Sequence, residues 1–406
     1  MTEAYMRIAL ITDTFPPLRS SGSVQLRDLS REFVKQGHEF IVLLPWHDQI
    51  EKWRLEDYGG VKVLFLKAPK TKDVSYFKRT IAEVIMPFAM RRNLKLSPLL
   101  TVRWDAILWY SPSIFHGPFV SKLKGLNNAK SYLIIRDVFP EWALDMGLLR
   151  RGIPYLFFKM VAKYQYSVAD VIGVQTPGNL SYFESWVSHK QGRKLEVLKN
   201  WLDKPANLEC SIRVNKTALA GRFIFVYAGN MGVAQGMDVI LQLVDKLNYR
   251  TDIGFLLVGR GSEVADLKQF AKEKDLRNIE FFDEIDPDEI PDLYSQCSAG
   301  IVALDPRHKS HNIPGKFITY MQSGLPVLAN LNSGNDLIQI IRDENVGQVC
   351  DTNNVEELMI LCDKLIDQVN TDRMLSLRCK AFFNREFAVE NTVKQIVKAV
   401  SKSNVL

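Results

Sequence analysis

Short runs of apolar residues recur along this chain and alternate with segments of helical periodicity, and no other feature constrains its fold as strongly. Residues 6–12 form such a run, rich in Ile and Leu, and a polar loop follows at residues 13–22. Ser23 can cap the helical segment that comes next, and Gly37 can end it before a second apolar run at residues 40–44. This order of strand, loop, helix and strand predicts a parallel sheet with right-handed crossovers.

The same alternation fills both halves of the chain. In the first half we expect further strands at residues 61–66, 104–110, 131–135, 171–175 and 195–198. In the second half we expect them at residues 223–227, 254–258, 279–282, 300–303 and 326–329, with helices between them, for example at 236–247 and 263–274. Because 406 residues exceed what one hydrophobic core usually organises, the pattern predicts two doubly wound α/β domains.

A polar break with a proline, at residues 200–205, marks the expected domain boundary. The sequence thus predicts an N-terminal domain at residues 1–199 and a C-terminal domain at residues 200–386. The remaining segment, residues 387–406, is expected to form an amphipathic helix that packs back toward the N-terminal domain. Sheets of this kind bind ligands beyond the carboxyl ends of their strands, so we expect a ligand in a cleft between the domains.

Charge is divided unevenly along the chain. Residues 1–199 carry 29 Lys/Arg and 18 Asp/Glu, a net +11, whereas residues 200–406 carry 23 and 28, a net −5. Residues 67–103 hold nine basic and two acidic residues, a net +7, interleaved with apolar side chains. This composition favours contact with an anionic membrane surface. A solvated basic loop or a nucleic-acid-binding patch is the alternative, but no nucleic-acid-binding motif accompanies the charge.

Cysteine, histidine and hydropathy patterns exclude several other classes of protein. The five cysteines lie far apart in the sequence and the six histidines form no ligand motif, so we expect reduced thiols and no metal. No apolar run reaches 18 residues, and the N-terminus lacks the pattern of a signal peptide. We therefore expect a cytoplasmic protein that binds the inner face of the plasma membrane peripherally.

A glycine-rich loop follows the first strand expected in the second domain, and a helix follows that loop. Gly229 and Gly232 can let backbone N–H groups approach an anion, and the helix N-terminus adds partial positive charge. The loop indicates a diphosphate site, although packing turns also use glycine. Arg260, in a glycine-flanked turn after the next strand, is either a ligand contact or a plain surface residue.

Two further loops of the second domain have a similar composition. Gly315 and Lys316 begin a helix, where the lysine can bind a phosphate as a point charge or remain solvated. Gly334 and Asn335 lie in a small polar loop after the strand at residues 326–329. Four such loops at the strand ends of one sheet predict a nucleotide diphosphate as ligand, with plain connectors as the alternative.

These loops and several other motifs resemble those of the retaining glycosyltransferases of family 4, which have the two-domain GT-B fold. The resemblance spans nearly the whole chain. It rests on residues 13–22 (a glycine loop), 35–39 (KQGHE), 136–141 (RDVFPE, similar to a D-L-W-P-E motif of bacterial surface polysaccharide assembly), 169–176 (AD and a later T), 200–203 (NWLD), 229–236 and 323–327. Within the family, the overall similarity is to transferases of N-acetyl-L-fucosamine in O-antigen biosynthesis.

The resemblance implies a metal-independent enzyme without a cofactor, of the hexosyltransferase or N-acetylhexosaminyltransferase type. It would move a sugar from a UDP-sugar to a polyprenyl-diphosphate-linked saccharide in lipopolysaccharide synthesis. Amides and cations would stabilise the leaving diphosphate, which would itself take the proton of the acceptor. Asp137 would orient a sugar, or else cap a helix. Glu141 is the second candidate, and Arg136, where many relatives have His, would pair with a phosphate or with Asp137.

The residues expected to bind the donor are Gly22, Gly229, Asn230, Gly232, Gln235, Arg260, Gly315, Lys316, Thr319, Gly334 and Asn335. Four positions depart from the pattern of the family. Asn230 and Gln235 stand where Arg and Lys are frequent. His311 and Thr319 replace two glutamates, of which the second usually holds the ribose. Lys316 and the loop amides are therefore expected to balance more of the diphosphate charge.

Other functions fit the same architecture. A UDP-sugar 2-epimerase shares the two domains, but a soluble substrate does not require the basic apolar segment at residues 67–103. The missing glutamates would also suit a protein that binds sugar nucleotides without turnover. A nicotinamide dehydrogenase fits less well, because it requires a tight Gly-x-Gly-x-x-Gly turn that residues 13–22 do not contain.

Overall fold

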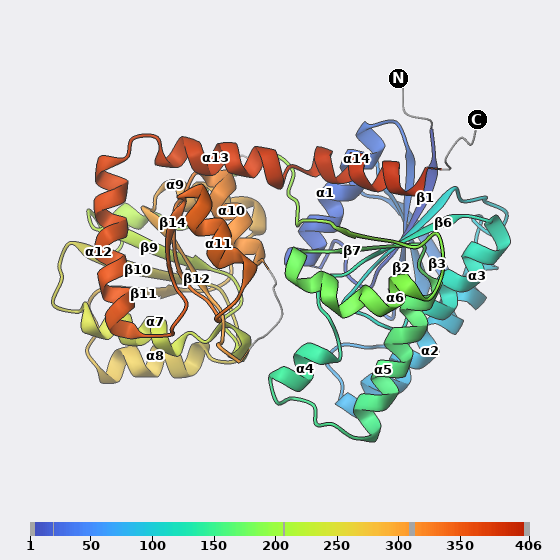
Figure 1. Ribbon diagram of the computed structural model, residues 1–406, viewed down its shortest axis with the longest axis horizontal. Helices are drawn as coiled ribbons and strands as arrows, with labels where there is room; N and C mark the ends of the chain where they lie inside the picture. The colour runs from blue at the N-terminus through green and yellow to red at the C-terminus, as the bar shows by residue number, and fades with distance from the viewer. Residues whose placement is uncertain (1–4, 19, 206–207, 308–312, 402–406) are drawn as a thin grey trace. The chain divides into compact units, whose positions relative to one another are not determined.

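The computed structural model describes residues 5–18, 20–205, 208–307 and 313–401. The chain divides into two compact units, each with its own sheet (Figure 1). The first unit comprises Met1–Asp203 and Val389–Leu406, and the second comprises Lys204–Ala388. The chain thus leaves the first unit a few residues after the expected boundary and returns to it at Val389.

Within the described residues, the first unit has a sheet of eight strands in the order β3-β4-β2-β1-β5-β6-β7-β8. Neighbouring strands pair in parallel, except that β3 is antiparallel to β4. The strands are β1 (Arg7–Ile11), β2 (Glu39–Trp46), β3 (Trp53–Asp57), β4 (Lys62–Lys67), β5 (Ala106–Tyr110), β6 (Lys130–Ile134), β7 (Val171–Val174) and β8 (Lys194–Val197).

Helices cover both faces of this sheet, because successive side chains of its buried strands point to opposite sides. Ala9 and Ile11 pack in a core cluster with α2, α3 and α5, whereas Ile8 and Leu10 pack in another with α1 and α14. The helices of the unit are α1 (Ser21–Lys35), α2 (Tyr76–Leu94), α3 (Gly117–Asn127), α4 (Glu141–Asp145), α5 (Ile153–Val168), α6 (Glu184–Ser188) and α14 (Val389–Val400), with a 3-10 helix at Pro177–Phe183.

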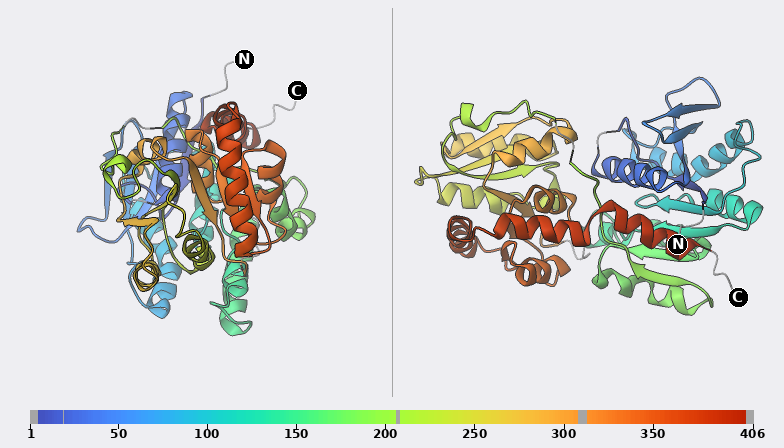
Figure 2. Two further views of the ribbon diagram at one scale, coloured as in Figure 1. Left: turned by 90° about the vertical axis from the view of Figure 1, so that its left-hand side faces the viewer. Right: turned by 90° about the horizontal axis from the view of Figure 1, so that it is seen from above.

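The last helix, α14, completes the core of the first unit. Its residues Val393 and Ile396 are fully buried in the cluster that contains Leu29 of α1. The side-chain amide of Gln395 donates a hydrogen bond to the backbone carbonyl of Val197 at 2.8 Å. Figures 1 and 2 show α14 beside α1 within this unit.

The second unit has, in its described part, a parallel sheet of six strands in the order β11-β10-β9-β12-β13-β14. From β9 the chain first builds the sheet outward through β10 and β11, and then returns to the other side of β9 for β12, β13 and β14. The strands are β9 (Phe223–Ala228), β10 (Ile253–Val258), β11 (Ile279–Phe282), β12 (Ala299–Ala303), β13 (Val327–Asn330) and β14 (Gly347–Cys350).

Helices also flank the second sheet, and α7, α8 and α12 share a core cluster with it. The helices are α7 (Asp238–Lys246), α8 (Val264–Glu273), α9 (Ile290–Ser295), α10 (Gly315–Ser323), α11 (Asp336–Glu344), α12 (Val355–Thr371) and α13 (Leu375–Glu386). Short 3-10 helices lie at Val214–Lys216, Val233–Gln235 and Pro287–Glu289. In the described part of the chain, no helix is both long and apolar enough to cross a bilayer.

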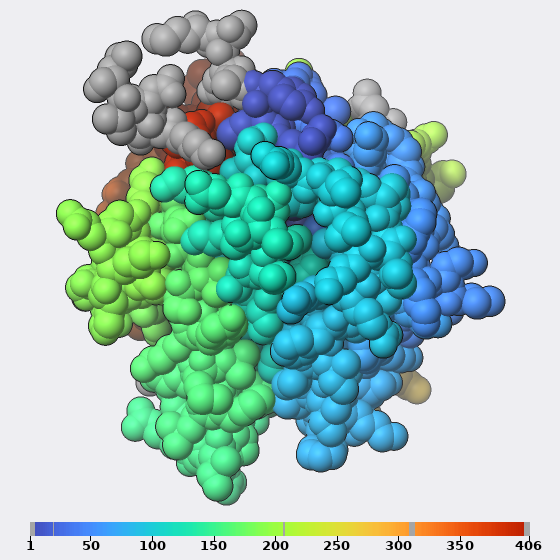
Figure 3. Space-filling model, turned by 90° about the vertical axis from the view of Figure 1, so that its right-hand side faces the viewer, coloured from blue at the N-terminus to red at the C-terminus, as the bar shows by residue number. Residues whose placement is uncertain are grey.

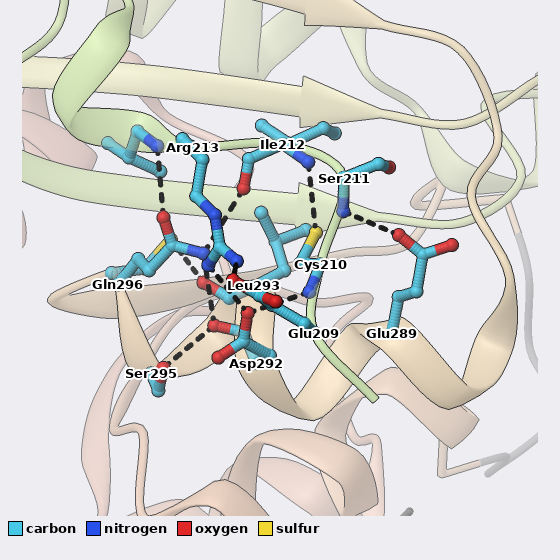
Figure 4. A network of polar contacts seen from close by, with 12 residues as sticks. Glu209, Cys210, Ser211, Ile212, Arg213, Glu289, Asp292, Leu293, Ser295 and Gln296 are labelled. Carbon is cyan, nitrogen blue, oxygen red and sulfur yellow. Dashed lines mark hydrogen bonds and ion pairs between the residues drawn. The ribbon is translucent and has the colours of Figure 1, made fainter. Parts of the chain in front are cut away.

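Polar contacts fix the segment that leads into the second unit against its α9 (Figure 4). The backbone N–H groups of Cys210 and Ser211 donate to Asp292 and Glu289, each at 2.7 Å. Arg213 forms an ion pair with Asp292 at 3.0 Å. The chain is therefore part of the second unit well before β9 begins.

The expectation of two doubly wound α/β domains is confirmed, and the expected strands lie within about two residues of the observed ones. Strands β3 and β14 were not expected. The expected role of Ser23 is wrong: α1 begins at Ser21, and the hydroxyl of Ser20 caps it by accepting from the N–H of Ser23 at 3.2 Å. Serine suits either position, so composition alone could not locate the cap.

Candidate active site

In the second unit, the strand order reverses between β9 and β12, and doubly wound sheets bind ligands at such a point. The loops that leave the two strands meet there. The N–H of Asp305, after β12, donates to the carbonyl of Ala234, after β9, at 3.0 Å. A Cβ on Gly236 would lie 3.0 Å from the Cα of Asp305, so the two loops are in close contact.

Helix α10 holds Lys316 above this junction. Tyr320, one helical turn after Lys316, is buried, and its hydroxyl donates to the carbonyls of Val226 in β9 (2.9 Å) and Ile301 in β12 (3.2 Å). The Nζ of Lys316 lies 4.4 Å from the ring centre of Tyr227, in cation–π contact. Its Cε is 3.7 Å from the position of a Cβ on Gly229. The structure therefore brings the predicted Lys316 and Gly229 together.

Two glycines after β10 let its loop run against the loop after β9. The N–H of Met231 donates to the carbonyl of Arg260 at 2.8 Å. A Cβ on Gly259 would lie 2.0 Å from the carbonyl oxygen of Gly229, and one on Gly261 would lie 2.0 Å from that of Met231. Both glycines have φ above +140°, so any other residue there would have a strained backbone in addition to the clash of its Cβ. This backbone contact fixes the course of the loop that contains Gly229.

The predicted residues Asn230, Gly232 and Gln235 form a local network. The side-chain oxygen of Gln235 accepts hydrogen bonds from the N–H of Gly232 and the side-chain amide of Asn230, both at 3.0 Å. In this arrangement the N–H of Gly232 is already used, so a phosphate would have to displace Gln235 to reach it.

The structure places the other predicted donor residues around the same sheet edge. Arg260 is exposed and pairs with Glu284 at 3.2 Å. The hydroxyl of Thr319 donates to the carbonyl of Gly315 within α10 at 3.2 Å. Gly334 precedes Asn335, whose side chain caps α11 by accepting from the N–H of Leu337 at 2.9 Å. His311 lies outside the described residues.

The first unit has its own reversal point, between β1 and β5. Gly22 lies in the first turn of α1, where a Cβ would be 3.3 Å from the hydroxyl of Tyr110, at the end of β5. The hydroxyl of Thr14, in the loop after β1, lies 3.0 and 2.9 Å from those of Ser20 and Ser23. A larger residue at position 22 would thus press on the end of β5.

Asp137 and Glu141 follow β6, the next strand of this sheet. Asp137 is half-buried, and its carbonyl accepts a hydrogen bond from the hydroxyl of Ser111 at 3.3 Å. Helix α4 begins at Glu141 with Pro140 as its N-cap residue, three positions after Asp137. Glu141 pairs with Lys159 of α5 at 3.6 Å.

Arg136 is buried beneath these residues, with only 4% of its surface exposed. Its guanidinium lies 4.3 Å from the ring centre of Trp201 and 5.9 Å from that of Tyr110. Among the described residues, none forms a hydrogen bond with any of its three side-chain nitrogens. Burial lowers the pKa of this guanidinium. A buried cation that lies against aromatic rings is suited to an anionic ligand.

His116 is a candidate that the sequence analysis did not identify. It follows β5, immediately before α3, and is completely buried. Neither ring nitrogen has a hydrogen-bond partner among the residues that the structure describes. Burial lowers the pKa of the imidazole, while the charge of Asp13 acts in the opposite direction. The available signal is a lone histidine between a buried strand and a Gly-Pro helix start, which a search for clusters of metal-binding histidines does not detect.

In the described part of the chain, no three His, Cys, Asp or Glu side chains come together as a group that could hold a metal ion.

The second unit contains a segment that matches a known protein family. Residues 222–368 match a protein family described as "Glycosyl transferases group 1". This range contains β9, the glycine loops and Lys316, and most of the second unit. This part of the second unit is therefore similar to the glycosyl transferases of group 1.

Two curated relatives extend the likeness to most of the chain. The probable glycosyltransferase WbjE of Pseudomonas aeruginosa is 24% identical over 356 residues, which cover 79% of this chain and 85% of WbjE. The putative colanic acid biosynthesis glycosyl transferase WcaI of Escherichia coli K12 is 24% identical over 349 residues, which cover 78% and 79% of the two chains.

Solved structures show that the chain has the GT-B fold. A sucrose-phosphate synthase from Thermosynechococcus elongatus matches with a TM-score of 0.76 and 15% identity, over 97% of this chain and 98% of that one. WaaG, a glycosyltransferase involved in lipopolysaccharide biosynthesis, matches with a TM-score of 0.65 and 12% identity, over 98% and 100%. HepE of Anabaena, in complex with UDP and glucose, matches with a TM-score of 0.65 and 14% identity, over 98% and 100%.

Proposed function

We propose that this protein is a glycosyltransferase that moves a sugar from a UDP-sugar to a saccharide linked to a polyprenyl diphosphate, in the synthesis of a bacterial surface polysaccharide such as O-antigen. The observation that carries the proposal is the position of Lys316, held by Tyr320 above the glycine loop where the strand order reverses. A cation, a helix N-terminus and glycine amides at one point suit a diphosphate. The printed names of WbjE, WcaI and WaaG support the pathway, and the HepE complex supports UDP.

In this proposal the second unit stabilises the leaving UDP without a metal. Lys316 and the N–H groups at the start of α10 would take up the charge that develops on the diphosphate as the glycosidic bond breaks. Gln235 would leave the N–H of Gly232 to the phosphates when the donor binds. The leaving phosphate would accept the proton of the acceptor hydroxyl, so no strong base is needed in the protein.

The first unit would bind the acceptor and orient the sugars. Asp137 would accept a hydrogen bond from a sugar hydroxyl. Glu141 is already paired with Lys159, so it would influence the substrate through its charge and not by direct contact. Arg136 is suited to a phosphate of the lipid-linked acceptor, because the described residues give its nitrogens no hydrogen-bond partner. We propose UDP-N-acetyl-L-fucosamine as the first donor to test.

The acceptor would be reached at the inner face of the plasma membrane through residues 67–103. Helix α2 buries Met86 and Met90 on one side, as expected of a surface helix. On its other side it exposes apolar residues, including Phe77 (76% exposed) and Phe88 (57% exposed). Basic side chains such as Arg92 are exposed on the same helix. We propose that this combination binds anionic lipid.

The decisive experiment is to incubate the purified protein with single sugar nucleotides and a polyprenyl-diphosphate-linked saccharide, and to follow UDP release and the mass of the lipid product. We expect UDP release that requires the acceptor, with a product heavier by one sugar. Conversion of the sugar nucleotide without acceptor would instead indicate a 2-epimerase. Binding of UDP without turnover of any donor would indicate a protein without transferase activity.

A further inference from the structure

Helix α5 has an apolar outer face that the sequence analysis did not single out. Its inner side packs on the sheet through Ala162 and Val168. Its outer side exposes four apolar side chains at helical spacings of three and four residues, so they form one continuous stripe. They are Ile153 (85% exposed), Leu156 (64%), Met160 (63%) and Tyr164 (46%).

The charged residues of the segment that contains this stripe are all basic. Residues 146–168 contain Arg150, Arg151, Lys159 and Lys163 and no Asp or Glu. Arg150, Arg151 and Lys163 are exposed. Lys159 lies within 3.6 Å of Glu141, which precedes this segment. An apolar stripe flanked by cations complements an anionic lipid surface, whereas the centres of protein interfaces are usually depleted in lysine.

Helices α2 and α5 lie on the same side of the first unit. Both contribute to one core cluster, and α3 contacts each of them. Figure 3 shows the segments around the N-terminal ends of α2 (light blue) and α5 (green) as two adjacent projections from one face. The exposed apolar residues near these ends include Tyr76 and Phe77 of α2 and Ile153 and Leu156 of α5. The two helices therefore offer apolar side chains and cations in the same region.

We infer that the outer stripe of α5, together with the basic loop before it, inserts into an anionic bilayer beside α2. This inference rests on the proposed membrane association of residues 67–103 and adds a second element to it. Two adjacent amphipathic surfaces bind more tightly than one, because the second contact forms without a further loss of translational freedom. Two contacts would also define which face of the first unit meets the lipid. With a single helix inserted, the unit could still rotate about the axis of that helix.

The test is flotation of the full chain with vesicles of phosphatidylcholine alone or with added phosphatidylglycerol. We expect the wild type to bind only the anionic vesicles. The double variant Leu156→Glu/Met160→Glu should bind them roughly tenfold more weakly or worse, because it removes apolar contact and adds negative charge. The matched control is Ile360→Glu/Leu377→Glu, which alters two side chains of the second unit that are each 58% exposed and should bind as the wild type does.

Two further measurements separate the outcomes. Both variants should keep the thermal unfolding temperature of the wild type and its UDP release with a short-chain, water-soluble acceptor, which shows that loss of binding is not loss of folding. The variant Ile81→Glu/Ile85→Glu tests α2 in the same way. Weak binding of the α2 variant with unchanged binding of the α5 variant would overturn this inference and leave the proposed function intact.

Failure of the wild type to bind either kind of vesicle would overturn both the inference and the proposed membrane association. The transfer assay would still test the enzymatic activity separately. Self-association of the lipid-free wild type in size-exclusion chromatography, abolished by Leu156→Glu/Met160→Glu, would assign the stripe to a second copy of the chain and would also overturn the inference.

Discussion

Neighbouring residues fix the position of Lys316. Tyr320 fixes α10 to two strands, and Tyr227 lies under the ammonium group. We predict that Lys316→Ala weakens UDP binding by roughly ten- to a hundredfold, the loss typical of a hydrogen bond to a charged group. Isothermal titration calorimetry can measure it. Lys246→Ala, at an exposed lysine of the same unit that lies 3.9 Å from Glu356, serves as the control and should bind UDP normally.

Asp137 is predicted to act on the substrate and not on folding. It lies three residues before the N-cap residue of α4, and it is half-buried. Asp137→Asn should therefore lower kcat by roughly a hundredfold, within the range for a positioned polar group, with little change in the unfolding temperature. Asp145→Asn, at the end of α4, is the matched control. Transfer by Asp137→Asn at the wild-type rate would remove this residue from the site.

Asp170 belongs to a motif that supported the family resemblance, yet its contacts are structural. Its carboxylate accepts from Lys124 at 2.7 Å and from the hydroxyl and N–H of Ser131 at 2.8 and 3.0 Å. Burial alone would raise the pKa of this carboxyl, but Lys124 and Ser131 outweigh it and hold the pKa below its ordinary value of 3.8. The charged form is therefore favoured by folding.

This depressed pKa makes a pH-dependent prediction. The stabilisation is complete at a pH well above 3.8 and is lost as the pH falls through the lower pKa of the folded state. Asp170→Asn should reduce the free energy of unfolding by about 2 kcal/mol at neutral pH, and by less at acidic pH. Urea unfolding followed by circular dichroism at both pH values measures the difference. An equal loss at both would show that the charge does not contribute.

At the scale of single residues, the sequence predicted which residues lie at the candidate site better than it predicted their side-chain contacts. Gly229 and Lys316 could be predicted because glycine loops and lysines at helix starts have a local signature, and the structure brings them together. Gln235 bonds to Gly232 through a side-chain rotamer that no pattern specifies. The isolation of Arg136 and His116 depends on which side chains from distant segments surround them. Such burial appears only in three dimensions.

Among the elements, buried strands were predictable and edge strands were not. The strands of both sheet centres are apolar runs, because helices cover both of their faces. Strand β3 is an antiparallel edge with partly exposed side chains, and its sequence WRLED contains no apolar run. Strand β14 is also an edge, of four residues, and begins at Gly347. Short edges lack the hydrophobic signal on which the prediction depends.

The contact between the loops after β9 and β10 provides a test at the level of the element. Gly259→Ala would place a Cβ 2.0 Å from the carbonyl oxygen of Gly229, at a φ of +142°. We predict a loss of about 2–3 kcal/mol in the stability of the second unit, together with weaker UDP binding as the Gly229 loop shifts. Differential scanning calorimetry with and without UDP measures both effects.

Gly221→Ala is the matched control for Gly259→Ala. Gly221 lies in the same unit and also has a positive φ, +77°, but no atom lies within 4 Å of the added Cβ. It should therefore show the cost of backbone strain without displacement of the loop, and UDP binding should stay normal. Equal loss of UDP binding in both variants would contradict the proposed role of the contact.

For the whole molecule, the separation of charge along the chain predicts how membrane binding responds to salt. Net charge is +11 over residues 1–199 and −5 over residues 200–406. Raising NaCl from about 0.05 M to about 0.5 M shortens the range of electrostatic attraction several-fold, so binding to anionic vesicles should fall steeply. Binding that is unaffected by salt would indicate that apolar insertion dominates. Flotation at several NaCl concentrations distinguishes the two.

The return of α14 to the first unit makes the second unit an insertion within its host. Val393, Ile396 and Val400 of this helix fill a core whose members outside the helix lie between Met6 and Trp201. During synthesis, all of residues 204–388 are made before that core can close. The inserted unit can therefore finish folding before the first unit does. Until α14 has been synthesised, the apolar residues of the first unit that pack against it stay uncovered and can cause aggregation.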